Sequence, residues 1–127
     1  MKNKMKKIIL VLLFLIFSPS INIADEILIE AKTLDYDKKN EIIKAEGDVV
    51  ANDQKSLIIK AQKIDFLKKK NLLKAEKFVE IVDTENNIKL NSNYIYFETI
   101  KGLITSEGET KIVINDNYNI KSKNVLF

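Results

Sequence analysis

A repeat of about thirty residues constrains this chain more than any other feature of its sequence. Three copies span residues 27–56, 57–87 and 88–119, and a fourth begins at Ile120. One aromatic position is kept at spacings of 30, 31 and 30 residues: Tyr36, Phe66, Phe97 and Phe127. A unit this short cannot bury an apolar face by itself, so the copies must stack and share one core.

Within each copy the apolar residues recur with a period of two, and many are β-branched or aromatic, which is typical of half-buried strands. Ile27, Ile29 and Ala31 alternate, and the pattern then resumes at Leu34, one residue out of phase. Because successive side chains of a strand point to opposite faces, the backbone must bulge or turn a corner at this slip. The slip recurs in every copy and predicts corners at Lys32-Thr33, Gln62-Lys63 and Asn93-Tyr94.

A second bend is expected in the later half of each copy. Gly47 and Gly108 interrupt the alternation there, and Lys77 takes the equivalent place in the middle copy. Glycine inside a strand pattern often marks a bulge or a bend. With turns at 38–40 and 52–54, each copy is predicted to be a bent β-hairpin. The predicted fold is all-β, with the hairpins stacked as an open β-jellyroll or short β-solenoid whose two ends are open sheet edges.

The first 24 residues have the order of a secretory signal peptide. Lysines at 2, 4, 6 and 7 precede an apolar run from Ile8 to Phe17, which Ser18-Pro19-Ser20 follows. Ten helical residues rise about 15 Å, roughly half the hydrocarbon thickness, so a membrane anchor is the weaker interpretation. We therefore expect export to the periplasm, cleavage near Ser20 or after Ala24, and one β domain over residues 25–127. The abrupt end at Phe127 favours a piece of a longer protein over a strand left to pair with a neighbour.

The composition excludes several functions. The chain has no histidine and no cysteine, which removes the usual nucleophilic triads, thiolate metal sites and disulfides. Without the four signal lysines, 17 basic residues face 18 acidic ones, a net charge of −1. Every basic residue is lysine, so the bidentate arginine contacts that read nucleic acid are missing. We expect no enzyme activity, no cofactor, no metal and no nucleic-acid partner.

The recurring charged and aromatic residues are interpreted as surface. The carboxylates are expected to form a solvated face rather than a general acid and base: Asp35, Asp65, Glu46, Glu76 and Glu107. The lysine runs 38–39 and 68–70 are expected on solvent-exposed turns, with contact to anionic head groups as the alternative. Tyr94 and Tyr96 alternate with Ile95 and Phe97, so one pair faces outward, as a surface pair rather than a cofactor platform.

The first copy carries a recognisable motif, in which an apolar-x-apolar-x-Ala run precedes Leu-Asp-aromatic and then Ala-Glu-Gly-Asp-Val. Its residues are Ile27, Ile29, Ala31, Leu34, Asp35, Tyr36, Ala45, Glu46, Gly47, Asp48 and Val49. This pattern resembles the OstA-like domain family of lipopolysaccharide transport over residues 26–127. The family includes the soluble periplasmic bridge protein LptA, the membrane-tethered LptC and the N-terminal domain of the outer-membrane protein LptD. Lys77 and Phe78 depart from the glycine pattern, and the third copy is the most polar.

The resemblance implies a β-jellyroll whose inner groove shields the acyl chains of lipopolysaccharide. It also implies edge strands that join similar domains into a bridge, and delivery to the outer-membrane assembly machinery. The signal sequence argues against the tethered member, and the end at Phe127 favours the N-terminal part of LptD over LptA. Alternation places nine residues on the groove lining: Ile29, Ile43, Val49, Ile59, Leu73, Val79, Ile81, Leu90 and Ile104.

Two alternatives stay open at this point. The alanines and serines at inward positions could leave room for a guest, or they could allow the two halves of the sheet to pack tightly. The competing function is a structural or adhesive β-solenoid with a solid core and edges that serve self-assembly. A carrier needs an apolar cleft open to solvent, whereas a filament does not.

Overall fold

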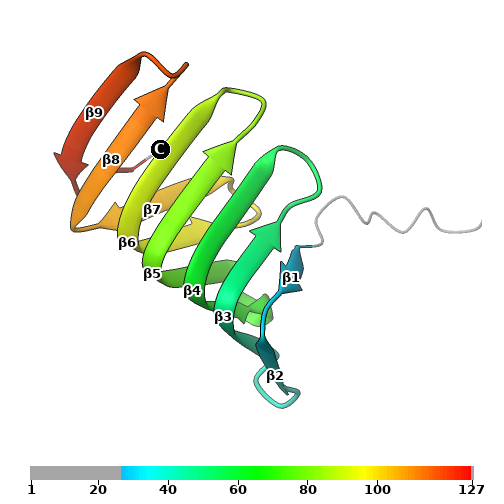
Figure 1. Cartoon of the computed structure of the whole chain (residues 1–127). Helices are drawn as coiled ribbons and strands as arrows, with labels where there is room; N and C mark the ends of the chain where they lie inside the picture. The colour runs from blue at the N-terminus through cyan, green and yellow to red at the C-terminus, as the bar shows by residue number, and fades with distance from the viewer. Residues whose placement is uncertain (1–26, 127) are drawn as a thin grey trace, which may run out of the picture.

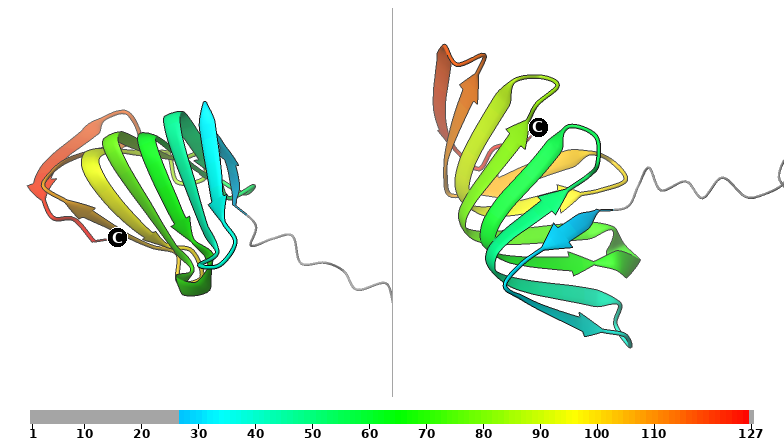
Figure 2. Two further views of the ribbon diagram at one scale, coloured as in Figure 1. Left: turned by 90° about the horizontal axis from the view of Figure 1, so that it is seen from below. Right: turned by 45° about the vertical axis from the view of Figure 1, so that its right-hand side comes forward.

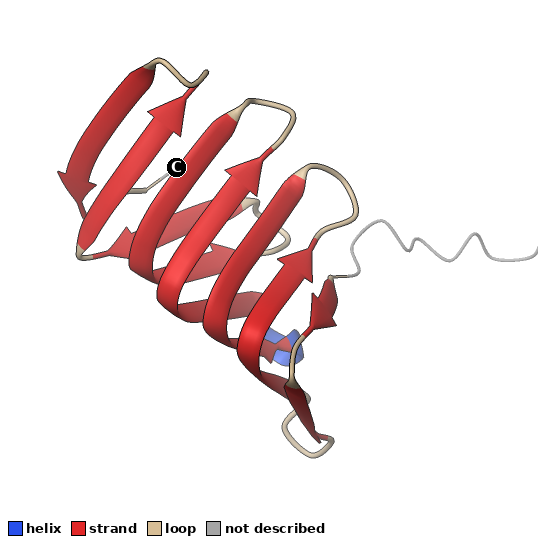
Figure 3. Ribbon diagram, in the orientation of Figure 1, coloured by secondary structure: helices blue, strands red, loops and turns tan. Residues whose placement is uncertain are grey.

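The computed structural model describes residues 27–126, which fold as a single antiparallel sheet of nine strands (Figure 1). The predicted signal peptide, residues 1–24, and the aromatic Phe127 lie outside the described residues. Figure 3 shows that strands dominate this part of the chain. Its one helical segment is the single 3-10 turn Lys68–Lys70, in the lysine run that the sequence placed on a turn.

The strands follow one another along the chain as consecutive bent hairpins. They are β1 (Leu28–Glu30), β2 (Thr33–Asp37), β3 (Ile42–Asn52), β4 (Leu57–Leu67), β5 (Leu72–Asp83), β6 (Ile88–Glu98), β7 (Leu103–Glu107), β8 (Glu109–Ile114) and β9 (Tyr118–Lys123). Each copy of the repeat contributes one bent hairpin, and β9 opens the fourth copy. The predicted all-β fold of stacked hairpins is therefore confirmed.

The sheet folds over on itself, so that its two halves face each other across an interior (Figures 1 and 2). One half, here called arm A, has the strand order β1-β3-β4-β5-β6-β8-β9. The other half, arm B, begins with β2, which pairs with β3, and ends with β7, which pairs with β6. The long strands β3 to β6 run through both arms and bend where the arms meet.

The bends lie where the repeat pattern slips. The pairing register shifts between Glu46 and Val49, between Lys60 and Lys63, and again between Glu76 and Val79. Gly47 and Gly108 both have a φ of 82°, in the left-handed region that favours glycine. Lys77 and Phe78 adopt the same region with φ of 66° and 53°. The middle copy therefore turns its corner without glycine, and the predicted corners and second bends are confirmed.

Aspartates stabilise the turn between β2 and β3 in arm B and the turn between β5 and β6 in arm A. Asp37 accepts hydrogen bonds from the backbone N–H of Asn40 at 3.1 Å and from its side-chain amide at 2.8 Å. Asp83 and Asn86 repeat this arrangement at 3.1 and 2.8 Å. The two turns share the pattern Asp-x-x-Asn, which satisfies backbone donors that the tight turn would leave free.

Inward-facing side chains form cross-strand rows. In arm B one row alternates large and small residues: Leu34, Ala45, Ile64, Ala75, Ile95 and Ser106. The next row alternates aromatic and aliphatic residues: Tyr36, Ile43, Phe66, Leu73, Phe97 and Ile104. Inward residues of both arms join one hydrophobic core. Tyr94 and Tyr96 face outward with ring centroids 4.8 Å apart, which confirms the expected surface pair.

Candidate functional site

The nine residues predicted to line a groove all belong to the inner face of the folded sheet. Seven of them are buried: Val49, Ile59, Leu73, Val79, Ile81, Leu90 and Ile104, none more than 5% exposed. Ile29 and Ile43, at the first rung, are half-buried and contact solvent. The two arms therefore pack directly on each other through the middle of the stack. That these nine residues contact a lipid stays a prediction.

The small inward residues serve this close packing. Ala45, Ala75 and Ser106 are each 0% exposed, so neighbouring side chains cover them completely. Ala45 and Ala75 both lie in register with Ile64, one on each side. Alternating large and small residues lets two facing layers interdigitate at the density of a protein interior. Of the two interpretations left open by the sequence, the structure supports tight packing in the described residues.

An open apolar pocket lies at the N-terminal end of the stack. Its volume is about 340 Å³, and its lining is Ile27, Ile29, Leu34, Asp35, Tyr36, Ile43 and Lys68. Leu34 and Tyr36 remain 55% and 46% exposed because no earlier described rung covers β2. The Lys68 ammonium stands 5.2 Å from the centre of the Tyr36 ring, a cation–π contact at the rim. The pocket thus combines an apolar lining with one cation at its rim.

Sequence reasoning identified only Ile29 and Ile43 among these pocket residues. It missed Ile27, Leu34, Tyr36 and Lys68, although Leu34 and Tyr36 follow the inward alternation of the first copy. Their position in the first hairpin of the stack was the signal that could have identified them as pocket residues. The first rung of a stack has no predecessor to cover its inner face, so its apolar residues are the ones that meet solvent.

The C-terminal end of the interior is polar and closed. Ser92, Ser106 and Thr110 are buried, and the hydroxyls of Ser106 and Thr110 are 2.6 Å apart. The chain after β9 crosses this end, where the N–H of Val125 donates to the Ser106 hydroxyl at 2.9 Å. The backbone N–H of Ser106 in turn donates to the carbonyl of Val125 at 2.8 Å. An apolar guest can therefore approach the core more readily from the β1–β2 end than from the β7–β9 end.

Both ends of the sheet present strand edges with exposed apolar residues. Leu28 of β1 is exposed, as are Tyr118 and Ile120 of β9. Every residue of β9 is exposed. An edge of this kind can template pairing with another strand, which agrees with the open edges expected from the repeat.

Chemistry-bearing groups are sparse over residues 27–126. This range contains no cluster of three or more residues able to hold a metal ion, and none of its helices is long and apolar enough to cross a bilayer. A hydrogen bond with Tyr96, together with partial burial, raises the pKa of the Tyr94 phenol. Of the recurring carboxylates, Asp65 departs from a fully solvated position, since its Oδ1 is buried without a hydrogen-bond partner.

No family model matches the chain, and no curated protein matches it. Its fold is similar to solved structures, among them the crystal structure of LptH from Pseudomonas aeruginosa, with a TM-score of 0.73. LptH is described as the LptA-homologous periplasmic component of the conserved lipopolysaccharide transport device. The alignment covers 80% of this chain and 75% of LptH at 15% identity. The likeness confirms the β-jellyroll expected from the resemblance to the OstA-like family.

Proposed function

We propose that this protein is a periplasmic carrier of lipopolysaccharide that shields acyl chains against its apolar inner face. The observation that carries the proposal is the open apolar pocket at the first rung, whose lining residues Ile27 and Ile29 pack against the buried core. A lysine at the rim suits an amphiphile with an anionic head group, because the tail and the head then meet matching surfaces. The fold shared with LptH, a periplasmic component of lipopolysaccharide transport, supports the same function.

The physical basis of such a carrier is desolvation. Each acyl methylene taken out of water is worth about 0.8 kcal/mol, so a chain of about twelve carbons gains on the order of 10 kcal/mol. The pocket at β1 and β2 offers the first contact. Deeper entry requires the two arms to separate, since Val49 and Ile81 are covered in the closed interior. The protein then acts by replacing water along the chain and performs no reaction step.

The exposed edges give the carrier its partners. We propose that similar β-jellyroll domains join it through edge strands into a bridge that delivers lipid to the outer-membrane assembly machinery. The export signal predicted for residues 1–24 agrees with a periplasmic location. We propose a role either as the N-terminal part of an outer-membrane assembly protein of the LptD kind or as a soluble bridge of the LptA kind.

The test is photocrosslinking to lipopolysaccharide from a probe residue placed on the inner face. Ile29 and Leu28 are a matched pair, because they are neighbours on β1 and only Ile29 lines the pocket. We expect adducts at Ile29 and Ile43, and none at Leu28 or at the exposed turn residue Lys69. Adducts at Val49 or Ile81 would show in addition that the arms separate.

The closed middle of the interior also supports the second candidate, a structural or adhesive β-solenoid. In that function the core is solid, and the edges alone carry the interaction. A folded sample that gives no adduct at Ile29, Ile43, Val49 or Ile81 would exclude the carrier and favour the scaffold.

A further inference from the structure

The outer face of strands β2 to β5 follows a rule of charge pairing. Cross-strand neighbours on this face alternate lysine with a carboxylate, which is favourable when the two lie directly opposite. The pairs in register are Asp35 with Lys44, Lys44 with Asp65, Asp65 with Lys74, Glu46 with Lys63, Lys63 with Glu76, and Lys60 with Glu80.

The rule fails at the C-terminal end of arm A. Lys111 of β8 lies directly opposite Lys121 of β9, and its other cross-strand neighbour is the uncharged Asn91 of β6. Like charges directly opposite each other destabilise a strand pair. The ion pairs of the described residues join Lys32 to Asp48 and Lys101 to Glu98, so neither Lys111 nor Lys121 takes part in one. Two lysines thus lie directly opposite each other on one face of the strand pair, with no carboxylate in register with either.

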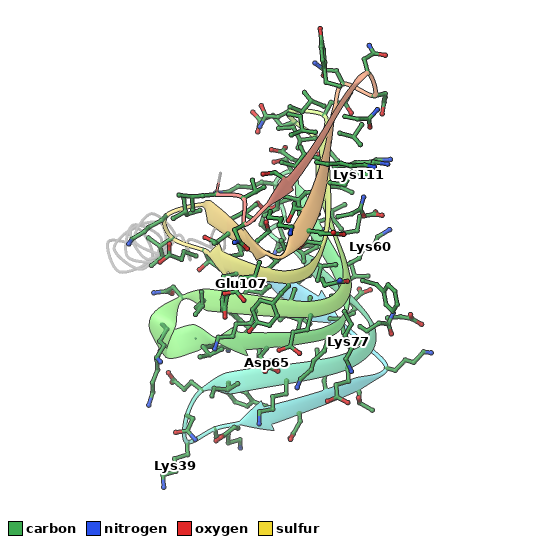
Figure 4. The ribbon with its side chains drawn as sticks, turned by 90° about the vertical axis from the view of Figure 1, so that its left-hand side faces the viewer. Lys39, Lys60, Asp65, Lys77, Glu107 and Lys111 are labelled. Atoms are coloured by element: carbon green, nitrogen blue, oxygen red, sulfur yellow. The ribbon has the colours of Figure 1, made fainter. Side chains whose placement is uncertain are left out.

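The same two lysines line a cavity at this end of the sheet. Its volume is about 540 Å³, and its lining is Asn91, Glu109, Thr110, Lys111, Lys121, Ser122 and Lys123. Glu109 lies in register with Lys123, which leaves Lys111 and Lys121 as the unmatched charges. Three lysines and one glutamate give the cavity a charge of +2. Figure 4 shows Lys111 on the same side of the sheet as Lys60, which belongs to the balanced part of the outer face.

We propose that this cavity, bounded by Lys111 and Lys121, binds a phosphate-bearing anion. A phosphate between the two ammonium groups would remove their repulsion and accept hydrogen bonds from both. The side-chain amide of Asn91 supplies a further donor on the same wall. Side chains stand out from the plane of a sheet, so a strand added to the β9 edge leaves this outer face accessible. The anion can be the head group of a lipid or a soluble phosphate, and the site does not depend on the proposed carrier function.

The first experiment is titration of the folded protein with inorganic pyrophosphate, followed by amide NMR shifts and by the melting temperature. We expect saturable shifts at Asn91, Lys111 and Lys121, and a rise in melting temperature. The variant Lys111→Gln/Lys121→Gln should raise the dissociation constant at least about tenfold and lose the thermal response. In the absence of pyrophosphate this variant should melt at or above the wild-type temperature, because the like-charge pair is gone. The matched control is Lys38→Gln/Lys39→Gln, which removes the same charge from the β2–β3 turn.

The second arm of the experiment distinguishes the sources of the phosphate. Flotation with vesicles of phosphatidylglycerol, set against vesicles of phosphatidylcholine, tests a lipid head group. Binding of pyrophosphate alone supports a soluble ligand, and binding of both probes with the same lysine dependence supports a head group. Equal losses in the two double variants, or the absence of saturable shifts at the cavity, would overturn the site, whatever lipopolysaccharide does at the inner face.

Discussion

Two corner glycines have the same backbone conformation but different surroundings. Gly47 and Gly108 both have a φ of 82°. A Cβ on Gly47 would lie 3.0 Å from the Cβ of Lys32, whereas a Cβ on Gly108 would meet nothing within 4 Å. The first corner is crossed closely by the segment between β1 and β2, and the last corner is open. Backbone strain and crowding can therefore be separated by one substitution at each position.

We expect Gly108→Ala to lower the free energy of unfolding by about 1 kcal/mol, the cost of a left-handed residue with a side chain. Gly47→Ala should cost more, about 2 kcal/mol, because Lys32 must also move. Urea unfolding of both variants, with an unchanged slope against denaturant, would measure the difference. Equal losses would show that Lys32 gives way freely and that crowding is unimportant at this corner.

The turn aspartates give the protein an acid sensitivity. Partial burial acts to raise the pKa of Asp83, but hydrogen bonds from Asn86 and Glu85 outweigh it, and the pKa lies below its ordinary value. At Asp37 the hydrogen bonds from the side chain and backbone of Asn40 are the main cause of a pKa that also lies below its ordinary value. A lowered pKa in the folded state stabilises the protein above the unfolded value of about 3.9, and this stability is lost as the pH falls through the folded pKa.

Stability should therefore be level near neutral pH and decline below about pH 4. Asp83→Asn should be less stable than the wild type at pH 7, and its decline in acid should be shallower, because one of the titrating groups is absent. Urea midpoints at pH 7, 4 and 2.5 would measure both slopes. Parallel curves for the wild type and Asp83→Asn would mean that the turn carboxylate has the same pKa in the folded and unfolded chains.

At the scale of strands and corners, much of the fold could be predicted because the signal is local. A phase slip in the apolar alternation is a property of a few neighbouring residues. The slip at Gln62-Lys63 is a register shift, and the slip at Asn93-Tyr94 lies opposite one. The slip at Lys32-Thr33 falls where β1 ends and β2 begins. The bend at Lys77 was predicted only by alignment with the glycines of the other copies, and the left-handed conformation of Lys77 and Phe78 was not predicted. For the interior of the third copy, the sequence indicated only that this copy is the most polar. The Ser92 hydroxyl donates to the carbonyl of Glu107, and the Thr110 hydroxyl donates to that of Ser92. Ser106 accepts the N–H of Val125 from the segment after β9. These contacts join residues of different strands, which no local pattern encodes.

The inward alternation of large and small residues is a property of paired strands rather than of single positions. Ile64 of β4 and Ala75 of β5 are cross-strand neighbours, and both are 0% exposed. Ile64→Ala should cost about 2–5 kcal/mol through a cavity, and Ala75→Ile about 1–3 kcal/mol through overpacking. Because the double variant restores the summed volume, its loss should be smaller than the sum by at least about 1 kcal/mol. A double-mutant cycle in urea measures this coupling, and strict additivity would show that the two sites relax independently.

At the scale of the whole molecule, burial depends on how many rungs cover a residue, which explains why the interior could not be predicted in full. Ile29 and Ile81 occupy equivalent inward positions of the same cross-strand row, yet Ile81 is buried and Ile29 lines an open pocket. The difference arises because no strand of the described residues lies on the other side of β1. The alternation of apolar residues identified which side chains face inward. Whether an inward side chain is also covered depends on how many hairpins lie on each side of it, and alternation does not contain that information.

The two edges of arm A are related in a way that predicts how copies join. Seven strands lie in the order β1-β3-β4-β5-β6-β8-β9, each antiparallel to the next, so β1 and β9 run in the same direction. Ile29 and Ile120 stand at opposite ends of one inner cross-strand row. Head-to-tail stacking would therefore join β9 of one copy to β1 of the next as a parallel pair and continue this row. Such a joint is heterologous, so it extends into a chain of copies.

Ile120→Lys should prevent this joint, because it places an ammonium group on the apolar row at the strand edge, a device by which edge strands avoid pairing. The folded monomer should keep its stability within about 0.5 kcal/mol, since Ile120 is already 45% exposed. The matched control is Asn119→Lys, which adds the same charge one residue earlier, on the opposite face of β9. Light scattering over a concentration series should show association of the wild type and the control but not of Ile120→Lys. Association that survives in Ile120→Lys would mean that copies join through the exposed β2 edge of arm B instead, with Leu34 and Tyr36 at the contact.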